Sequence, residues 1–220
     1  KKRELLMLKR NEKSRYLNDK NNQINSLENL KKNEAVLAEK LKINNEKRRE
    51  ISKAVKAAIV EELKAAEKTD VSKFSVTPEG KAISKSFINN KGKLSWPVER
   101  GEITSNYGKH QHHLVSTAFI DNNGVDITTS KNSFVRSVFD GKVTSVLIIP
   151  GAGKVVMISH GEYRTVYANL QEVFVQKGEI VTTKENIGKL LSKNSGVSES
   201  HFEIWKINSS GMNTVNPIIW

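Results

Sequence analysis

Four polar residues in the C-terminal half are spaced so that they could bind a metal ion. Asn122 and Asp126 are four residues apart, and Glu199 and His201 are two apart. A catalytic zinc ion needs three protein ligands chosen from imidazole, thiolate and carboxylate groups, with a fourth position open for water. Asp126 and His201 can supply two, whereas the neutral amide oxygen of Asn122 suits calcium or magnesium better than zinc. We therefore expect only a vestigial metal site at Asp126 and His201, with no bound metal or other cofactor.

The residues around this site are expected to form an all-β domain from about Lys93 to Trp220. Short segments rich in Val, Ile, Phe and Tyr alternate with Gly-containing turns, which is typical of strands joined by tight connections. His160, at the end of one such segment, is interpreted as a structural residue. The predicted strands cover residues 134–138, 142–149, 154–159, 163–167 and 202–206.

The N-terminal third has a different composition. All 13 Gly and all 4 Pro lie at or beyond Pro78, and residues 1–77 are rich in Lys, Glu, Asn and Leu. Because Gly and Pro are the main helix breakers, this segment predicts a helix. It also carries most of the basic excess, with 20 Lys and Arg against 12 Asp and Glu. We divide the chain into a coiled-coil helix at 1–68, a linker at 69–92 and a β domain at 93–220.

The apolar spacing in the second half of the helix is heptad-like but imperfect. Asn44, Arg48 and Glu62 occupy places where a coiled coil normally has apolar residues. An unbroken helix to Lys68 would be about 100 Å long, at about 1.5 Å per residue, which is too long to pack against one small domain. We expect a weak coiled coil whose second strand, in an antiparallel hairpin, comes from a part of the protein that precedes this sequence.

An apolar stripe on this helix precedes the linker. Ile51, Val55, Ile59 and Leu63 lie on one helical face. The sequence leaves two interpretations open: a continued coiled-coil seam, or an autoinhibitory arm at 46–68 that folds back over a groove of the β domain and blocks it until the coil is pulled. Unchanged partner binding after deletion of residues 46–68 would contradict the second interpretation.

Several motifs of the C-terminal half occur together in a fixed order. They lie at residues 96–98, 101–108, 139–143, 160–161, 167–170 and 216–217. In these motifs the chain resembles the lysostaphin/LytM-type zinc peptidases, whose active members bind zinc through an HxxxD motif and the second His of an HxH motif. Two further histidines in that family, in YxHL and at the first place of HxH, position or deprotonate the attacking water.

The resemblance places Asn122, Asp126 and His201 at the zinc-ligand positions, and Asn169 and Glu199 at the two remaining catalytic positions. Three of these five residues differ from the active pattern. Asn169 cannot accept a proton near neutral pH, and acid or base catalysis needs a group that can. The resemblance therefore implies a long helical segment followed by a catalytically degenerate LytM-type domain that is not an enzyme.

A degenerate LytM domain preceded by a coiled coil is similar to the EnvC-type murein hydrolase activators. That resemblance implies binding to an N-acetylmuramoyl-L-alanine amidase in cell separation, with the coiled coil answering to an FtsEX-like ABC-type membrane complex. Peptidoglycan is a further expected ligand. Aromatic residues dominate interface hot spots, so Tyr167 and Trp205 are the expected anchors. The alternative, above all for Tyr167, is that these two side chains pack inside the domain. The expected partner-binding groove comprises Asn122, Asn123, Asp126, Tyr167, Asn169, Glu199, His201 and Trp205.

The sequence leaves two other functions to consider, an active peptidase and a nucleic-acid binder. An active zinc metalloendopeptidase that cleaves peptidoglycan crosslinks would need a replacement ligand, for which the loop with His110, His112 and His113 is the candidate. The net charge of +12 permits a nucleic-acid binder. However, Lys and Arg alternate with Glu as on a solvated helix, and no recognition motif accompanies them, so nucleic acid is not an expected partner.

The residues themselves give little information on the cellular compartment. There is no apolar run of 18 or more residues, so no transmembrane helix is predicted. The absence of Cys excludes disulfides without choosing a compartment. A periplasmic location follows from the family resemblance, with the signal peptide expected to be absent from this sequence.

Overall fold

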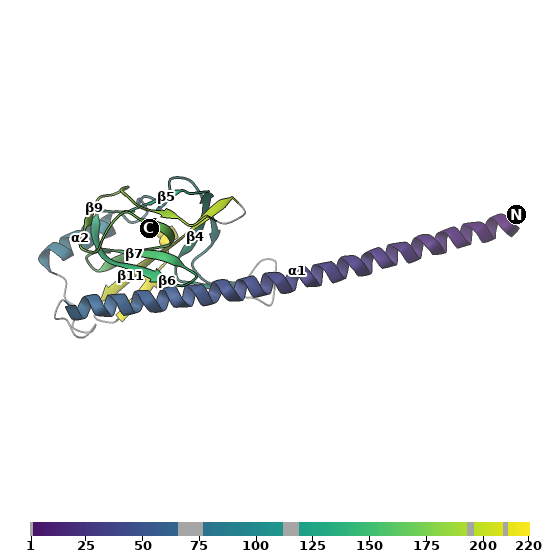
Figure 1. Cartoon of the computed structure of the whole chain (residues 1–220), viewed down its shortest axis with the longest axis horizontal. Coiled ribbons are helices and arrows are strands. Elements are labelled where there is room, and N and C mark those ends of the chain that lie inside the picture. Colours follow the sequence, from purple (N-terminus) through teal and green to yellow (C-terminus); the bar gives the residue numbers. More distant parts are fainter. Residues whose placement is uncertain (1, 66–76, 112–118, 193–195, 209–210) are drawn as a thin grey trace. The chain divides into compact units, whose positions relative to one another are not determined.

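The computed structural model describes residues 2–65, 77–111, 119–192, 196–208 and 211–220. The chain divides into two compact units, and the helix α1 (Lys2–Ala65) contributes to both (Figure 1). The candidate site lies in the second unit. The first unit comprises Lys1–Asn44 and Gln111–Phe119, and the second comprises Asn45–His110 and Ile120–Trp220.

The helix α1 confirms the helix expected from the composition. It contains no Gly or Pro over 64 residues and is rich in good helix formers such as Leu, Lys, Glu and Ala. In its first 44 residues large apolar side chains are exposed, among them Leu6, Leu17 and Ile24. Pairing of this stretch with a second helix stays a prediction. Among the described residues, none of the helices is long and apolar enough to cross a membrane.

A second helix, α2 (Pro78–Asn89), lies within the segment expected to be a linker. The hydroxyl of Thr77 accepts a hydrogen bond from Gly80 N at 3.1 Å, and Pro78 takes the first helical position. This is the expected chemistry of a helix start, because the first backbone N–H groups have no partner within the helix. Residues 78–89 of the expected linker at 69–92 are thus helical, and the division of the chain into these segments stays a prediction.

Ten of the described strands form one antiparallel sheet, whose main path runs in the order β1-β4-β11-β8-β7-β6-β9, and β2 and β3 form a separate two-stranded sheet. In addition, β10 pairs with β5 and β8, and β12 pairs with β11. The fold class predicted from the sequence, a long helix followed by an all-β domain, is confirmed. The strands are β1 (Glu102–Ser105), β2 (Gly108–Gln111), β3 (Phe119–Asn122), β4 (Val125–Ser130), β5 (Phe134–Arg136), β6 (Gly141–Ile149), β7 (Gly153–His160), β8 (Tyr163–Val173), β9 (Ile180–Val181), β10 (Asn186–Leu190), β11 (Val197–Asn208) and β12 (Gly211–Val215), followed by the 3-10 turn Pro217–Ile219.

The central strands are buried on both faces, and each face belongs to a different apolar cluster. Phe202 and Ile204 of β11 join the main core, where Phe87 of α2 and Trp220 also pack. Their neighbour Trp205 points to the opposite face and joins a second cluster. Since successive side chains of a strand alternate between faces, the same strands serve two clusters. The second cluster is closed by residues 51–63 of α1.

Candidate functional site

The candidate site lies on the face of the sheet that α1 covers. The apolar part of this face, called here the arm-covered face, is fully buried. Across it, α1 places the apolar stripe expected from the sequence: Ile51, Val55, Ile59 and Leu63 are at most 5% exposed. The packing is thus the one that a folded-back arm would have, while inhibition by it stays a proposal. The arm-covered face comprises Val155, Met157, Val166, Ala168, Trp205 and Ile207.

A chain of buried polar side chains runs along β11 beside this face. His201 Nδ1 lies 2.6 Å from Asp126 Oδ1, and His201 Nε2 lies 3.0 Å from Glu203 Oε1. Trp205 Nε1 donates to Glu203 Oε2 at 2.6 Å. The three residues 201, 203 and 205 share a face because they alternate along one strand, and the register of β11 with β4 places Asp126 opposite His201.

The two carboxylates determine the charge of His201. Burial alone would lower the pKa of its imidazole, but the hydrogen bonds and negative charges of Asp126 and Glu203 outweigh burial and raise that pKa to about 9. Burial alone would raise the pKa of the Asp126 carboxyl, but His201 and Arg48 together hold that pKa well below its usual range. His201 is therefore an imidazolium near neutral pH, and both ring nitrogens act as donors.

The second partner of Asp126 comes from α1. The guanidinium of Arg48 forms an ion pair with Asp126 Oδ2, and it also lies within hydrogen-bond distance of Ser105 Oγ and Asn45 Oδ1, at 3.4 and 3.2 Å. Both charged side chains are largely buried. A cation on the arm thus neutralises the carboxylate that the family resemblance places at a metal-ligand position.

Asn122 is oriented by its own turn. Its Oδ1 accepts a hydrogen bond from Gly124 N at 3.1 Å. A backbone N–H can only donate, so this contact fixes which end of the amide is oxygen. The other end, Nδ2, donates to Ser105 Oγ at 3.1 Å and lies 3.4 Å from Asp126 Oδ2. Asn122 therefore presents N–H groups, not a free oxygen, toward Asp126.

These contacts do not fit a zinc ion in this conformation. A zinc-bound imidazole must be neutral and leave one nitrogen lone pair free, whereas His201 donates with both nitrogens. The amide oxygen of Asn122 is engaged, and Arg48 already pairs with Asp126. Within the described part of the chain, no group of three or more His, Cys, Asp or Glu side chains is arranged to hold a metal.

Asn169 and Glu199, at the other two family positions, lie next to each other. Asn169 Nδ2 donates to the backbone oxygen of Glu199 at 3.1 Å, and Asn169 adopts a left-handed backbone conformation with φ of 66°. Its Oδ1 is buried and has no hydrogen-bond partner among the described residues. Glu199 is partly exposed on β11. Asn123 is also partly exposed and lines a pocket of about 310 Å³ with Asp121 and Arg49.

The structure places the two predicted aromatic anchors on opposite faces of the sheet. Tyr167 lies in the main core, on the sheet face opposite the arm, where its hydroxyl accepts a hydrogen bond from Val138 N at 3.0 Å. Its inclusion in the groove is therefore wrong, because β8 turns Val166 and Ala168 toward the arm and Tyr167 away from it. Trp205 does face the arm but is only 1% exposed, so it cannot meet a partner while the arm is in place.

The remaining histidines have structural surroundings where they are described. His160, the last residue of β7, is fully buried; its ring stacks on Phe87 at 4.8 Å and bonds Asp140 O and Thr165 Oγ1, which confirms its structural role. Burial lowers its pKa to about 4. His110 bonds the carbonyl of Gly108 at 3.1 Å. His112 and His113 lie outside the described residues.

Two residues of the hydrogen-bond network around Asp126 and His201 were not predicted from the sequence. Glu203 could have been found, because it follows His201 by two residues in a predicted strand and so shares its face. Arg48 was identified only as a polar interruption of the apolar stripe. Its position one turn before Ile51 places it on the same helical face, which is the signal that could have linked it to the site.

Comparison with known proteins supports a peptidase-family fold for this domain. Residues 121–217 match the model of peptidase family M23. The chain is 34% identical over 95 residues to the peptidoglycan DD-endopeptidase ShyB of Vibrio cholerae, covering 42% of this chain and 22% of that protein. It is 34% identical over 103 residues to ShyA of the same organism, covering 46% and 24%. It therefore spans about a quarter of the length of these two curated relatives.

Solved structures give similar matches. Helicobacter pylori Csd3 is 30% identical, with a TM-score of 0.47, over 57% of this chain and 33% of that chain. A zinc-containing peptidase from Vibrio cholerae is 29% identical, with a TM-score of 0.46, over 56% and 38%.

Proposed function

Because the chain carries an M23 peptidase (LytM-type) domain, we propose that this domain acts without cutting, as an activator of peptidoglycan N-acetylmuramoyl-L-alanine amidases in cell separation. The observation that carries the proposal is the pairing of Asp126 with both Arg48 and His201. These contacts use the groups that a zinc peptidase would need for its metal. An M23 domain with such a site is suited to binding rather than hydrolysis.

Binding alone is sufficient for activation. A protein that binds the open form of an amidase more tightly than the closed form shifts the population toward the open form by that difference in affinity. The groove for the amidase would be the face that the arm covers, with Asn122, Asn123, Asp126, Asn169, Glu199, His201 and Trp205 as its contact residues.

The arm makes this activity conditional. Ile51, Val55 and Ile59 are at most 1% exposed against the sheet, so an amidase could reach the groove only after the arm leaves. A pull on the coiled-coil part of α1 by an FtsEX-like membrane complex would provide that release. Under this proposal the protein would act in the periplasm.

Dye release from labelled peptidoglycan tests the proposal. The protein with its arm opened by Arg48→Glu and Glu62→Arg, the candidate amidase alone and the mixture are compared. Release only in the mixture is the expected result. Equal release by the amidase with and without the protein would contradict activation.

A second candidate function is a zinc metalloendopeptidase that cleaves peptidoglycan crosslinks. The observation that favours it is the 34% identity to two relatives named as peptidoglycan DD-endopeptidases. It requires that Arg48 leave and that His201 lose a proton before metal binds. Stoichiometric zinc in the purified protein, together with release by the protein alone that a chelator abolishes, would support this candidate instead.

A further inference from the structure

An ion pair with the domain lies near each end of the arm, and the arm supplies the positive charge in one pair and the negative charge in the other. Near its start, the arm supplies the cation: Arg48 pairs with Asp126 of the domain. Near its end, the arm supplies the anion: Glu62 Oε1 and Oε2 accept from Arg164 Nη2 and Nε at 2.6 and 3.2 Å. Between the two pairs lies the arm-covered face.

Both domain charges are fixed in place independently of the arm. Arg164 is 4% exposed, and its Nη1 donates to the carbonyls of Gly161 and Tyr163 at 2.6 and 2.9 Å. Asp126 is also 4% exposed and is held by His201. Neither side chain can follow the arm when it leaves, so each would remain as a charge at the edge of an apolar face.

Uncompensated charges of this kind are costly, and a ligand that removes water from them without pairing them binds poorly. We propose that the arm-covered face is a binding surface for a peptide segment whose apolar side chains are flanked by a cation at the Asp126 end and an anion at the Arg164 end, about 21 Å apart if the segment is helical. The inference rests on the proposed function, in which a partner takes the place of the arm, and it specifies the chemistry of that partner segment.

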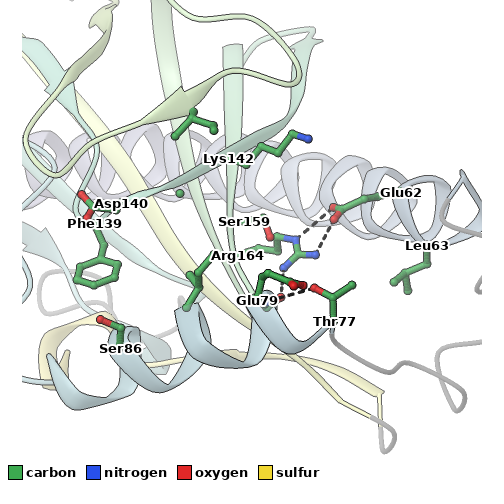
Figure 2. A pocket seen from close by; sticks show the side chains of 15 residues that line it. Glu62, Leu63, Thr77, Glu79, Ser86, Phe139, Asp140, Lys142, Ser159 and Arg164 are labelled. Atoms are coloured by element: carbon green, nitrogen blue, oxygen red, sulfur yellow. Dashed lines mark hydrogen bonds and ion pairs between the residues drawn. The ribbon is translucent and has the colours of Figure 1, made fainter.

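The surroundings of the Asp126 end agree with this polarity. At the Asp126 end, the arm presents Arg49, Lys53 and Lys56 around a pocket that Asp121 and Asn123 line. At the other end, Figure 2 shows Arg164 paired with the carboxylate of Glu62. Both residues line a pocket of about 670 Å³, which Glu79, Asp140 and Lys142 also line. The fixed order of charges also gives the bound segment a direction.

The test uses the full chain with the arm charges reversed, Arg48→Glu with Glu62→Arg, so that its own arm is mismatched. The chain has no Cys, so an added Ala58→Cys, on the side of the arm that packs against the sheet and 6% exposed, reports opening through its rate of thiol labelling. Fluorescent synthetic peptides copying residues 46–65 are then titrated by anisotropy. One has the native sequence, one has Arg48→Glu with Glu62→Arg, and one has Glu61→Lys with Lys64→Glu as the control. Glu61 and Lys64 are exposed, and the control changes the same number of charges with the same net charge.

The expected result is faster thiol labelling than in the chain with native arm charges, and native-peptide affinity at least about 10-fold above that of the reversed peptide. The control peptide should bind within about 3-fold of the native one, because exposed charges contribute little. Equal binding of the native and reversed peptides would overturn the inference. Thiol labelling as slow as in the chain with native arm charges would also overturn it, because the face would then accept an arm with reversed charges. A chain that is open by thiol labelling but does not bind the native peptide would overturn it as well. An amidase that fails to bind the open chain would contradict the proposed function while leaving the ranking of the peptides intact.

Discussion

Arg48 on α1 and Asp126 on β4 form a largely buried ion pair between residues 78 positions apart in the sequence. This contact joins α1 to the residue that the family resemblance places at a zinc-ligand position. The carboxylate keeps two cationic partners, Arg48 and protonated His201. A positive charge from the protein thus lies where a peptidase of this family would need its metal.

Removal of the guanidinium should loosen the arm. Arg48→Ala leaves Asp126 with His201 as its charged partner and should lower the free energy of unfolding by about 1–3 kcal/mol, the range for hydrogen bonds to charged groups. It should also raise amidase activation in the absence of any trigger. Urea denaturation measures the first effect. Arg49→Ala, at an exposed neighbouring position, is the matched control and should change stability by less than about 0.5 kcal/mol. Equal effects of the two variants would argue against a role for the ion pair.

Stability should fall on the alkaline side because of His201. Its folded pKa of about 9 lies above the ordinary value of 6.5, so the folded state holds the proton more tightly than the unfolded state. The resulting stabilisation is fully present below pH 6.5 and is lost as pH rises to about 9, with a total on the order of 3 kcal/mol. Urea titrations from pH 6 to 9.5 measure it. His201→Gln should flatten this slope, and an unchanged slope would show that another group is responsible.

His160 should act in the opposite direction on the acid side. Burial lowers its folded pKa to about 4, so the unfolded state binds the proton first as pH falls. The contribution of His160 to stability should be constant above pH 6.5 and should fall by roughly 3 kcal/mol as pH drops from 6.5 to 4. The measurement is the difference in unfolding free energy between the native chain and His160→Gln across this window. A difference independent of pH would contradict the assignment.

Gly161 should be intolerant of a side chain, because α2 packs directly on it. An added Cβ would lie 2.1 Å from Ser84 Oγ and 2.2 Å from the backbone oxygen of Gly80, and φ is +79°. Gly161→Ala should destabilise the domain by about 2–4 kcal/mol, with backbone strain and steric overlap combined. Gly178→Ala is the control, since φ there is +96° but no atom lies within 4 Å. It isolates the backbone cost, so a similar loss in both variants would show that α2 is not held by this contact.

The sequence predicted the parts of the molecule that depend on local pattern. The absence of Gly and Pro before residue 78 predicted α1, and alternating β-branched and aromatic residues predicted most of the central strands. Asp126 and His201 were correctly brought together, because family motifs fix their strands. Tyr167 was misplaced because a shift of one residue moves a side chain to the other face of a sheet, and only the pairing of β8 with its neighbours sets that parity.

The charge pairs could not be predicted from the sequence. Arg48 and Glu62 each meet a partner that is 78 and 102 residues away, and no local pattern specifies such a distance. In a heptad-like helix both are polar interruptions. Their role depends on how the helix lies on the sheet, which tertiary packing alone determines.

The most direct test of a binding domain that does not cut uses the chain with the arm opened by Arg48→Glu and Glu62→Arg. Dye release from labelled peptidoglycan is measured for this variant alone, for the amidase alone and for the mixture, each with added zinc and with chelator. We predict no release by the variant alone under either condition, and release in the mixture that exceeds that obtained with the unaltered protein. Release by the opened variant alone that requires zinc would contradict the account and identify a peptidase restrained by its arm.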